Sequence, residues 1–185
     1  MPGSFYLLIL NGAILTVCAV FIDTERHMLL VALMLSLPLL DKDFRSLKYK
    51  SVHRSIFLWL VPVSLIALLI LIDPSQQASL VGIILLTALP EEWFFRRYFQ
   101  QLLQKLLSIY ANFQIRLSTA WAANIITSLL FTLLHLPLQG ITGLSVFIPS
   151  LFLGWLYQLK KDIILIILIH SLFNVFFLIF IQPLM

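Results

Sequence analysis

Apolar residues occur in long blocks along this chain, and short polar or charged segments separate the blocks. Seven blocks approach the roughly 20 residues that a helix needs to span a bilayer. They cover residues 5–22, 27–40, 55–72, 78–107, 118–138, 144–159 and 163–181. We therefore predict an all-α, polytopic membrane helix bundle of about seven hydrophobic helices. The second and sixth blocks are short for spanning, so those helices are expected to be tilted, broken or partly re-entrant.

The composition strengthens the membrane interpretation. Hydrophobic residues make up 61% of the chain, charged residues make up 11%, and the mean hydropathy is +1.04. These values lie far outside the range of soluble domains. The 185 residues contain no Gly/Ser-rich linker and no internal repeat, so we predict a single transmembrane domain, 1–185. Cys18 is the only cysteine, which excludes a disulfide within one chain.

The basic residues predict an orientation. When the seven blocks alternate in direction, nearly all Lys and Arg residues fall on one side, and Arg26 lies opposite. The shared side holds Lys42, Arg45, Lys48, Lys50, Arg54, Lys105, Arg116, Lys160 and Lys161. The positive-inside rule makes that side cytoplasmic, with the N-terminus inside and the C-terminus outside. The net charge of +4 then reflects topology and contact with anionic lipid, so no nucleic-acid partner is expected.

Two adjacent carboxylates, Glu91 and Glu92, lie within the fourth apolar block. A charged side chain near the bilayer centre costs roughly 2.5 to 3.5 kcal/mol, so this pair is expected to face a wet or protein-lined cavity. Arg96 lies one helical turn after Glu92, which predicts an internal ion pair and leaves Glu91 free for chemistry. The alternative is a helix that ends at Pro90, with both carboxylates in the first turn of the next helix.

Two further polar groups lie inside apolar blocks. In the fifth block, Asn124 and Ser128 precede His135 by near-whole numbers of turns, so the three are expected to share one face. In the seventh block, His170 and Asn174 lie one turn apart. Each group alone is explained by hydrogen bonding between helices. The other two histidines, His27 and His53, fall at membrane–water boundaries.

Together these residues suit hydrolysis of an acyl bond by activated water. Glu91 would take a proton from water, and His135 would hold that water or pass the proton on. His170 and Asn174 would donate hydrogen bonds to the developing oxyanion. Serine chemistry is disfavoured because the chain has no Gly-x-Ser-x-Gly elbow. Zinc held by Glu91, His135 and His170 is the alternative, although the chain lacks the His-Glu-x-x-His spacing.

Three motifs, Glu91-Glu92-x-x-x-Arg96, Phe131-x-x-x-His135 and His170-x-x-x-Asn174, occur in this order on separate blocks. They resemble the CPBP intramembrane protease family, which includes the type II CAAX prenyl endopeptidases and bacteriocin-processing or self-immunity proteins. The resemblance covers a catalytic core of about 78–176. It implies a glutamic-type endopeptidase with Glu91, His135, His170 and Asn174 as catalytic residues. Glu92, Arg96 and Phe131 would support them, and no cofactor would be required.

The chain is short for this family. It is similar to compact bacterial members, including those paired with C-terminal sorting tags in JDVT-CTERM or myxosortase-like systems. The resemblance therefore implies a multi-pass protein of the bacterial cytoplasmic (inner) membrane. Its substrate would be a membrane-associated protein or peptide, cut near its C-terminal region.

Two other functions compete with the protease. A small membrane transporter or proton-relay protein could use the deep carboxylates and His170, but transporters usually spread acidic residues over several helices. A catalytically inactive bacteriocin-immunity-type member is the second alternative. Block lengths also leave a difficulty, since His135 falls near the outer end of its block and His170 near the inner end of its own. We expect a break or kink at Pro90 or Pro137 to bring them together.

Overall fold

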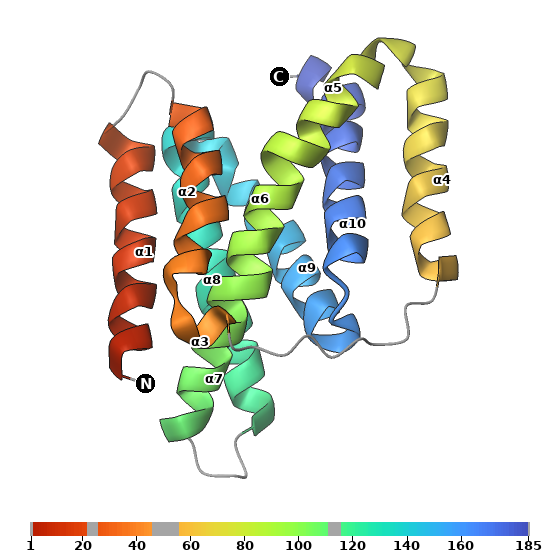
Figure 1. Cartoon of the computed structure of the whole chain (residues 1–185). Helices are drawn as coiled ribbons and strands as arrows, with labels where there is room; N and C mark the ends of the chain where they lie inside the picture. The colour runs from red at the N-terminus through yellow and green to blue at the C-terminus, as the bar shows by residue number, and fades with distance from the viewer. Residues whose placement is uncertain (1, 22–25, 46–55, 111–115, 185) are drawn as a thin grey trace.

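The computed structural model describes residues 2–21, 26–45, 56–110 and 116–184 (Figure 1). Within this part of the chain every secondary-structure element is a helix or helical turn, so the predicted all-α fold is confirmed. The α-helices are α1 (Pro2–Phe21), α2 (Arg26–Leu40), α3 (Lys42–Arg45), α4 (Ile56–Ile72), α5 (Gln77–Gly82), α6 (Leu89–Glu92), α7 (Gln101–Tyr110), α8 (Arg116–Gln139), α9 (Phe147–Lys160) and α10 (Ile163–Phe176). His53 and three of the predicted topology residues, Lys48, Lys50 and Arg54, lie outside the described residues.

Shorter helical segments of other geometry join these helices. The 3₁₀ turns are η1 (Pro74–Gln76), η5 (Gly140–Val146) and η7 (Gln182–Leu184). The π-helical segments are η2 (Ile83–Ala88), η3 (Trp93–Gln100) and η6 (Phe177–Ile181). The α8–η5 junction falls at Gln139 and Gly140, where the sequence predicts a break, and Gly140 has the positive φ of 63° that favours glycine.

One continuous helix, which we call the central helix, runs from the start of α5 at Gln77 to the end of α7 at Tyr110. It crosses the bundle diagonally (Figure 1). Pro90 lies in the first turn of α6, between the two π-helical segments η2 and η3. The helix therefore continues through Pro90, and the alternative that it ends there is wrong. Wide π turns occur often at functional sites because they redirect side chains within a helix.

Three helices in the described part are long and apolar enough to cross a membrane. They are Thr119–Pro137, Gly140–Lys160 and Ile163–Ile181. Shorter apolar helices cover Tyr6–Val20, Arg26–Leu40 and Leu58–Ile72. Large apolar side chains are exposed on the outside of these helices, including Leu71 and Ile141, which is the surface expected of a bundle surrounded by lipid.

The interior is built around the central helix. One apolar cluster joins α1, α2 and α8 to the η3 segment, where Phe94, Phe95 and Tyr98 are fully buried. Cys18 packs against this cluster as a free thiol. On the other side, α9 and α10 share a second cluster around Tyr157 and Ile166, and α4 packs along α10 at the edge of the bundle (Figure 1).

Unequal helix levels resolve the difficulty over His135 and His170. The end of α7 and the start of α8 project beyond the turn that joins α9 to α10 (Figure 1). A residue late in α8, such as His135, can therefore lie level with a residue near the middle of α10, such as His170. The Phe131 ring confirms this, since its centroid is 4.3 Å from that of His135 and 6.2 Å from that of His170. The helix is not broken at either proline, because Pro137 lies inside α8 and the central helix continues through Pro90.

Candidate active site

The buried ion pair between Glu92 and Arg96 lies at the centre of the site. Arg96 Nε donates to Glu92 Oε2 over 3.2 Å, from one turn later in the same helix. Glu92 is 1% exposed and Arg96 is 0% exposed. Two charges so deeply buried are stable only when the remaining donors and acceptors are also satisfied. The predicted ion pair is present in the structure. Its burial is stable only if the remaining polar atoms of Arg96 and Glu92 also find partners.

Arg96 satisfies its other donors on α9. Its Nη2 donates to the Ser150 carbonyl oxygen over 2.9 Å and to Ser150 Oγ over 2.7 Å. Its Nη1 lies 3.4 Å from Gln100 Oε1, and Gln100 Nε2 donates to the Gly154 carbonyl oxygen over 3.1 Å. The guanidinium thus fixes the distance between the central helix and α9.

His170 lies between the two glutamates. Its Nδ1 is 2.7 Å from Glu92 Oε1, and its Nε2 is 3.6 Å from Glu91 Oε2. A carboxylate without a proton can only accept, so the Nδ1 atom carries the hydrogen of this short bond. Glu92 consequently holds both Arg96 and His170, while Glu91 has an oxygen near the opposite side of the imidazole. The bond between His170 and Glu92 joins α10 to the central helix. The sequence did not predict it, because helical periodicity relates only residues of the same helix.

Glu91 and His135 share a cavity of about 30 Å³ between α2, the central helix and α8. This is enough room for a water molecule, since one needs about 10 to 15 Å³ by this measure. His135 Nδ1 lies 2.8 Å from the carbonyl oxygen of Phe131. Because a carbonyl oxygen can only accept, Nδ1 carries the hydrogen and Nε2 of the neutral ring presents a lone pair.

Asn174 turns toward the central helix. Its Nδ2 donates to Thr87 Oγ1 over a long 3.4 Å, and Thr87 in turn donates to the Ile83 carbonyl oxygen. Thr87 lies one turn before Glu91, so the spacing of the sequence could have identified it. His27 is a second residue that the sequence did not assign to the site. Although exposed, it lines the same cavity as Glu91 and His135.

The other predicted polar residues of α8 have a packing role. Asn124 Nδ2 donates to the Leu151 carbonyl oxygen over 2.9 Å, and Ser128 Oγ lies 3.5 Å from Asn124 Oδ1. Both are fully buried against α9. Thus the polar stripe predicted on this helix divides, with Asn124 and Ser128 at the α9 interface and His135 at the cavity.

A family model for type II CAAX prenyl endopeptidase Rce1-like proteins matches residues 73–176. This range includes the central helix, α8, α9 and α10, and therefore every catalytic and supporting residue predicted from the sequence. The chain belongs to the Rce1-like family. Membership points to a CAAX-type intramembrane peptidase and away from the transporter alternative. No curated protein and no solved structure matches the chain.

Elements outside the Rce1-like match also contribute to the site. α2 precedes the matched range, yet His27, Leu30, Val31 and Met34 form one wall of the cavity that contains Glu91. Asn11 of α1 donates to the Tyr98 hydroxyl over 2.8 Å, which ties the N-terminal helix to the central one. The first two helices therefore belong to the same packed unit as the matched core.

The three residues considered as zinc ligands, Glu91, His135 and His170, do not form a ligand set in this Rce1-like chain. Among the described residues, no group of three or more His, Cys, Asp or Glu side chains is arranged to hold a metal. Glu91 contacts His170 directly, and His135 reaches the site only through the cavity and the Phe131 ring.

Proposed function

We propose that this protein is a glutamic-type intramembrane endopeptidase in which Glu91 and His135 activate water. The observation that carries the proposal is the small cavity that these two residues line, since it has room for a water molecule. A water held there would donate one hydrogen to a Glu91 oxygen and the other to His135 Nε2. Both hydrogens would then point away from the substrate, and an oxygen lone pair would face its carbonyl carbon.

Glu91 would take the proton as the water oxygen attacks the scissile carbonyl. In this mechanism His170 is an imidazolium, with its Nδ1–H on Glu92 and its protonated Nε2 3.6 Å from Glu91 Oε2. Once Glu91 is protonated it no longer attracts the Nε2–H, which is then free to donate to the oxyanion. His170 and Asn174, one turn apart on α10, would then stabilise the oxyanion of the tetrahedral intermediate. The proton on Glu91 would finally pass to the leaving amine as the peptide bond breaks. Glu92 and Arg96 are positioning residues in this mechanism, because they hold His170 by its Nδ1 atom.

We further propose that the substrate is a membrane-associated protein or peptide cut near its C-terminal region. The family supports a substrate of this class, and a C-terminal sorting tag and the bacterial cytoplasmic membrane remain part of the proposal. Metal-free hydrolysis is proposed as well, since Glu91, His135 and His170 are not arranged as zinc ligands.

Glu91→Gln tests the proposal, because it keeps the shape of the side chain and removes its basicity. The variant should retain the thermal stability of the wild type but lose at least about a hundredfold in cleavage rate. Cleavage would be measured in liposomes on membrane-anchored reporters that carry a pool of C-terminal segments, using any reporter that the wild type cuts. Asp73→Asn makes the same chemical change outside the cavity and should cleave at the wild-type rate.

A Glu91→Gln variant with wild-type activity would refute water activation by Glu91. A wild-type protein that cuts no reporter in the pool would instead favour the inactive, immunity-type member of the family.

A further inference from the structure

A second pocket lies far from the glutamates, at the end of the bundle where the basic residues gather. It has a volume of about 380 Å³, within the range of small-molecule sites. Among the described residues, six line it, all polar or charged and none acidic: Gln101, Gln104, Lys105, Ser108, Thr119 and Lys161. In a chain with 61% hydrophobic residues, a pocket formed by polar and charged residues, two of them lysines, is a feature that lipid packing does not explain.

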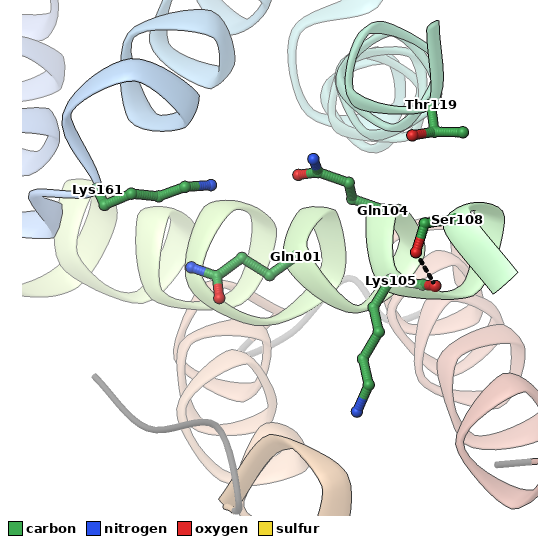
Figure 2. Close-up of a pocket in the computed structure, with 6 residues that line it drawn as sticks. All are labelled: Gln101, Gln104, Lys105, Ser108, Thr119 and Lys161. Atoms are coloured by element: carbon green, nitrogen blue, oxygen red, sulfur yellow. Dashed lines mark hydrogen bonds between the residues drawn. The ribbon is translucent and has the colours of Figure 1, made fainter. Parts of the chain in front are cut away.

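Lys161 is the most unusual residue of this pocket. It lies between α9 and α10 with φ of 52°, a left-handed conformation that costs a non-glycine residue free energy. Its side chain extends toward Gln104, whereas the Lys105 side chain points away (Figure 2). The Lys161 Nζ atom is 5.4 Å from the centre of the Tyr157 ring.

The Lys161 ammonium has no acidic partner among the described residues. Burial lowers its pKa below the ordinary lysine value of 10.5, because the charged form loses hydration that no carboxylate replaces. The neighbouring Asp162 is already engaged by the Trp59 indole and by the first amides of α10. An anion in the pocket would compensate the partly buried charge.

The surrounding groups suit an oxyanion with several acceptor atoms. Gln101 donates to the Tyr157 hydroxyl, and Ser108 donates to the Lys105 carbonyl oxygen. Gln104 reaches into the space beside Lys161 (Figure 2) and can offer its amide hydrogens. A phosphate group has enough oxygens to accept from an ammonium and an amide at once, and charge-assisted bonds of this kind are the strong ones.

We propose that this pocket binds a phosphate group, carried by a phospholipid headgroup or by free inorganic phosphate, with Lys161 as its principal ligand. Bound there, the phosphate would connect the end of the central helix to the turn between α9 and α10. This site is separate from the proposed peptidase site and does not depend on it.

The test compares Lys161→Gln with Lys160→Gln, which removes the same charge from the exposed neighbouring lysine. Full-length protein in a nonionic detergent would be titrated with sodium phosphate against sodium chloride of equal ionic strength. A second arm would titrate phosphatidylglycerol into the detergent and count bound lipids by native mass spectrometry. Lys161→Gln should weaken binding about tenfold or more, the effect of one charge-assisted hydrogen bond. Lys160→Gln should stay within about twofold of wild type by the surface-charge expectation.

Binding of the lipid but not of inorganic phosphate identifies the headgroup as the source, and binding of both identifies a general phosphate site. Gln104→Ala provides a second variant at a position that does not require left-handed backbone, and it should also weaken binding. Equal losses in Lys161→Gln and Lys160→Gln would overturn the proposal, because they indicate diffuse attraction to a basic surface. Absence of saturable binding in both arms would overturn it as well.

Discussion

At the scale of single residues, the site depends on which glutamate is already occupied. Glu92 is engaged on one oxygen by Arg96 and on the other by His170. Among the described residues, Glu91 has only the longer 3.6 Å approach of His170, and it faces the cavity. Two chemically identical neighbours thus have different surroundings, and the proposed mechanism uses this difference: Glu92 positions the imidazole and Glu91 acts on water.

Removing the arginine should therefore destabilise the protein. Arg96→Ala leaves Glu92 buried and unpaired, and breaking a buried pair in this way costs about 3 to 5 kcal/mol. We expect a lower unfolding temperature in detergent and a smaller yield of folded protein. Arg97→Ala removes a positive charge from the adjacent, half-buried position and should cost much less. Equal unfolding temperatures for these two variants would contradict the structural role of Arg96.

Metal-free hydrolysis gives a second prediction at this scale. Purified wild-type protein should hold no stoichiometric zinc, and its cleavage rate should survive extended treatment with a chelator. The reason is that a base and an imidazole acceptor already supply what water activation requires. Elemental analysis that finds about one zinc per chain, lost together with activity and restored on re-addition, would contradict this mechanism.

The sequence predicts the local part of this site and misses the long-range part. The spacing of Glu92 and Arg96, and of His170 and Asn174, gives their shared faces because α-helical periodicity is local. The bond between His170 and Glu92 joins α10 to the central helix, and no periodicity relates residues on separate helices. His27 was missed for the same reason: its role in the cavity wall follows from how α2 packs.

At the scale of elements, the central helix organises the bundle. The central helix forms a row of hydrogen bonds with α9: Arg96 with Ser150, Gln100 with Gly154, and Gln101 with Tyr157. The sequence predicted the helix from its apolar block, 78–107, but not its π-helical segments. Side chains of these segments bond to other helices, Arg96 and Gln100 to α9 and Thr87 to α10, and such contacts between helices are not visible in local sequence preference.

Gly154 makes the close approach of α9 possible. A Cβ there would lie 1.8 Å from Asn124 Oδ1 and 2.9 Å from Gln100 Oε1. We expect Gly154→Ala to lower stability by about 1 to 3 kcal/mol, the usual cost of overpacking. The matched control is Gly82→Ala in α5, where an added Cβ meets nothing within 4 Å and should stabilise the helix by about 0.5 to 1 kcal/mol. Thermal unfolding of both variants in one detergent checks the opposite signs, and two shifts of the same sign would contradict the packing argument.

At the scale of the whole molecule, the charges divide the bundle into two ends. The N-terminus lies at the end that carries the α7–α8 and α9–α10 connections, and the C-terminus lies at the other (Figure 1). Lys105, Lys160 and Lys161 belong to the first end, and Arg26 starts α2 at the second. The alternating direction of the helices was predictable, because each apolar block is separated from the next by a short polar segment at which the chain can turn back. The unequal levels of α8 and α10 were not, since they depend on packing between helices.

This division predicts the orientation of the bundle in the membrane, which can be tested by expression in a bacterium. The basic end should be cytoplasmic by the positive-inside rule, which places the turn at Lys160 inside and the segment at Gln182 outside. In a Cys18→Ser background, which removes the only native cysteine, Lys160→Cys and Gln182→Cys each add one exposed thiol. A membrane-impermeant maleimide should label Gln182→Cys in intact spheroplasts and Lys160→Cys only after permeabilisation. The reverse pattern would place the basic end outside, and the phosphate pocket beside Lys161 would then face the outer leaflet.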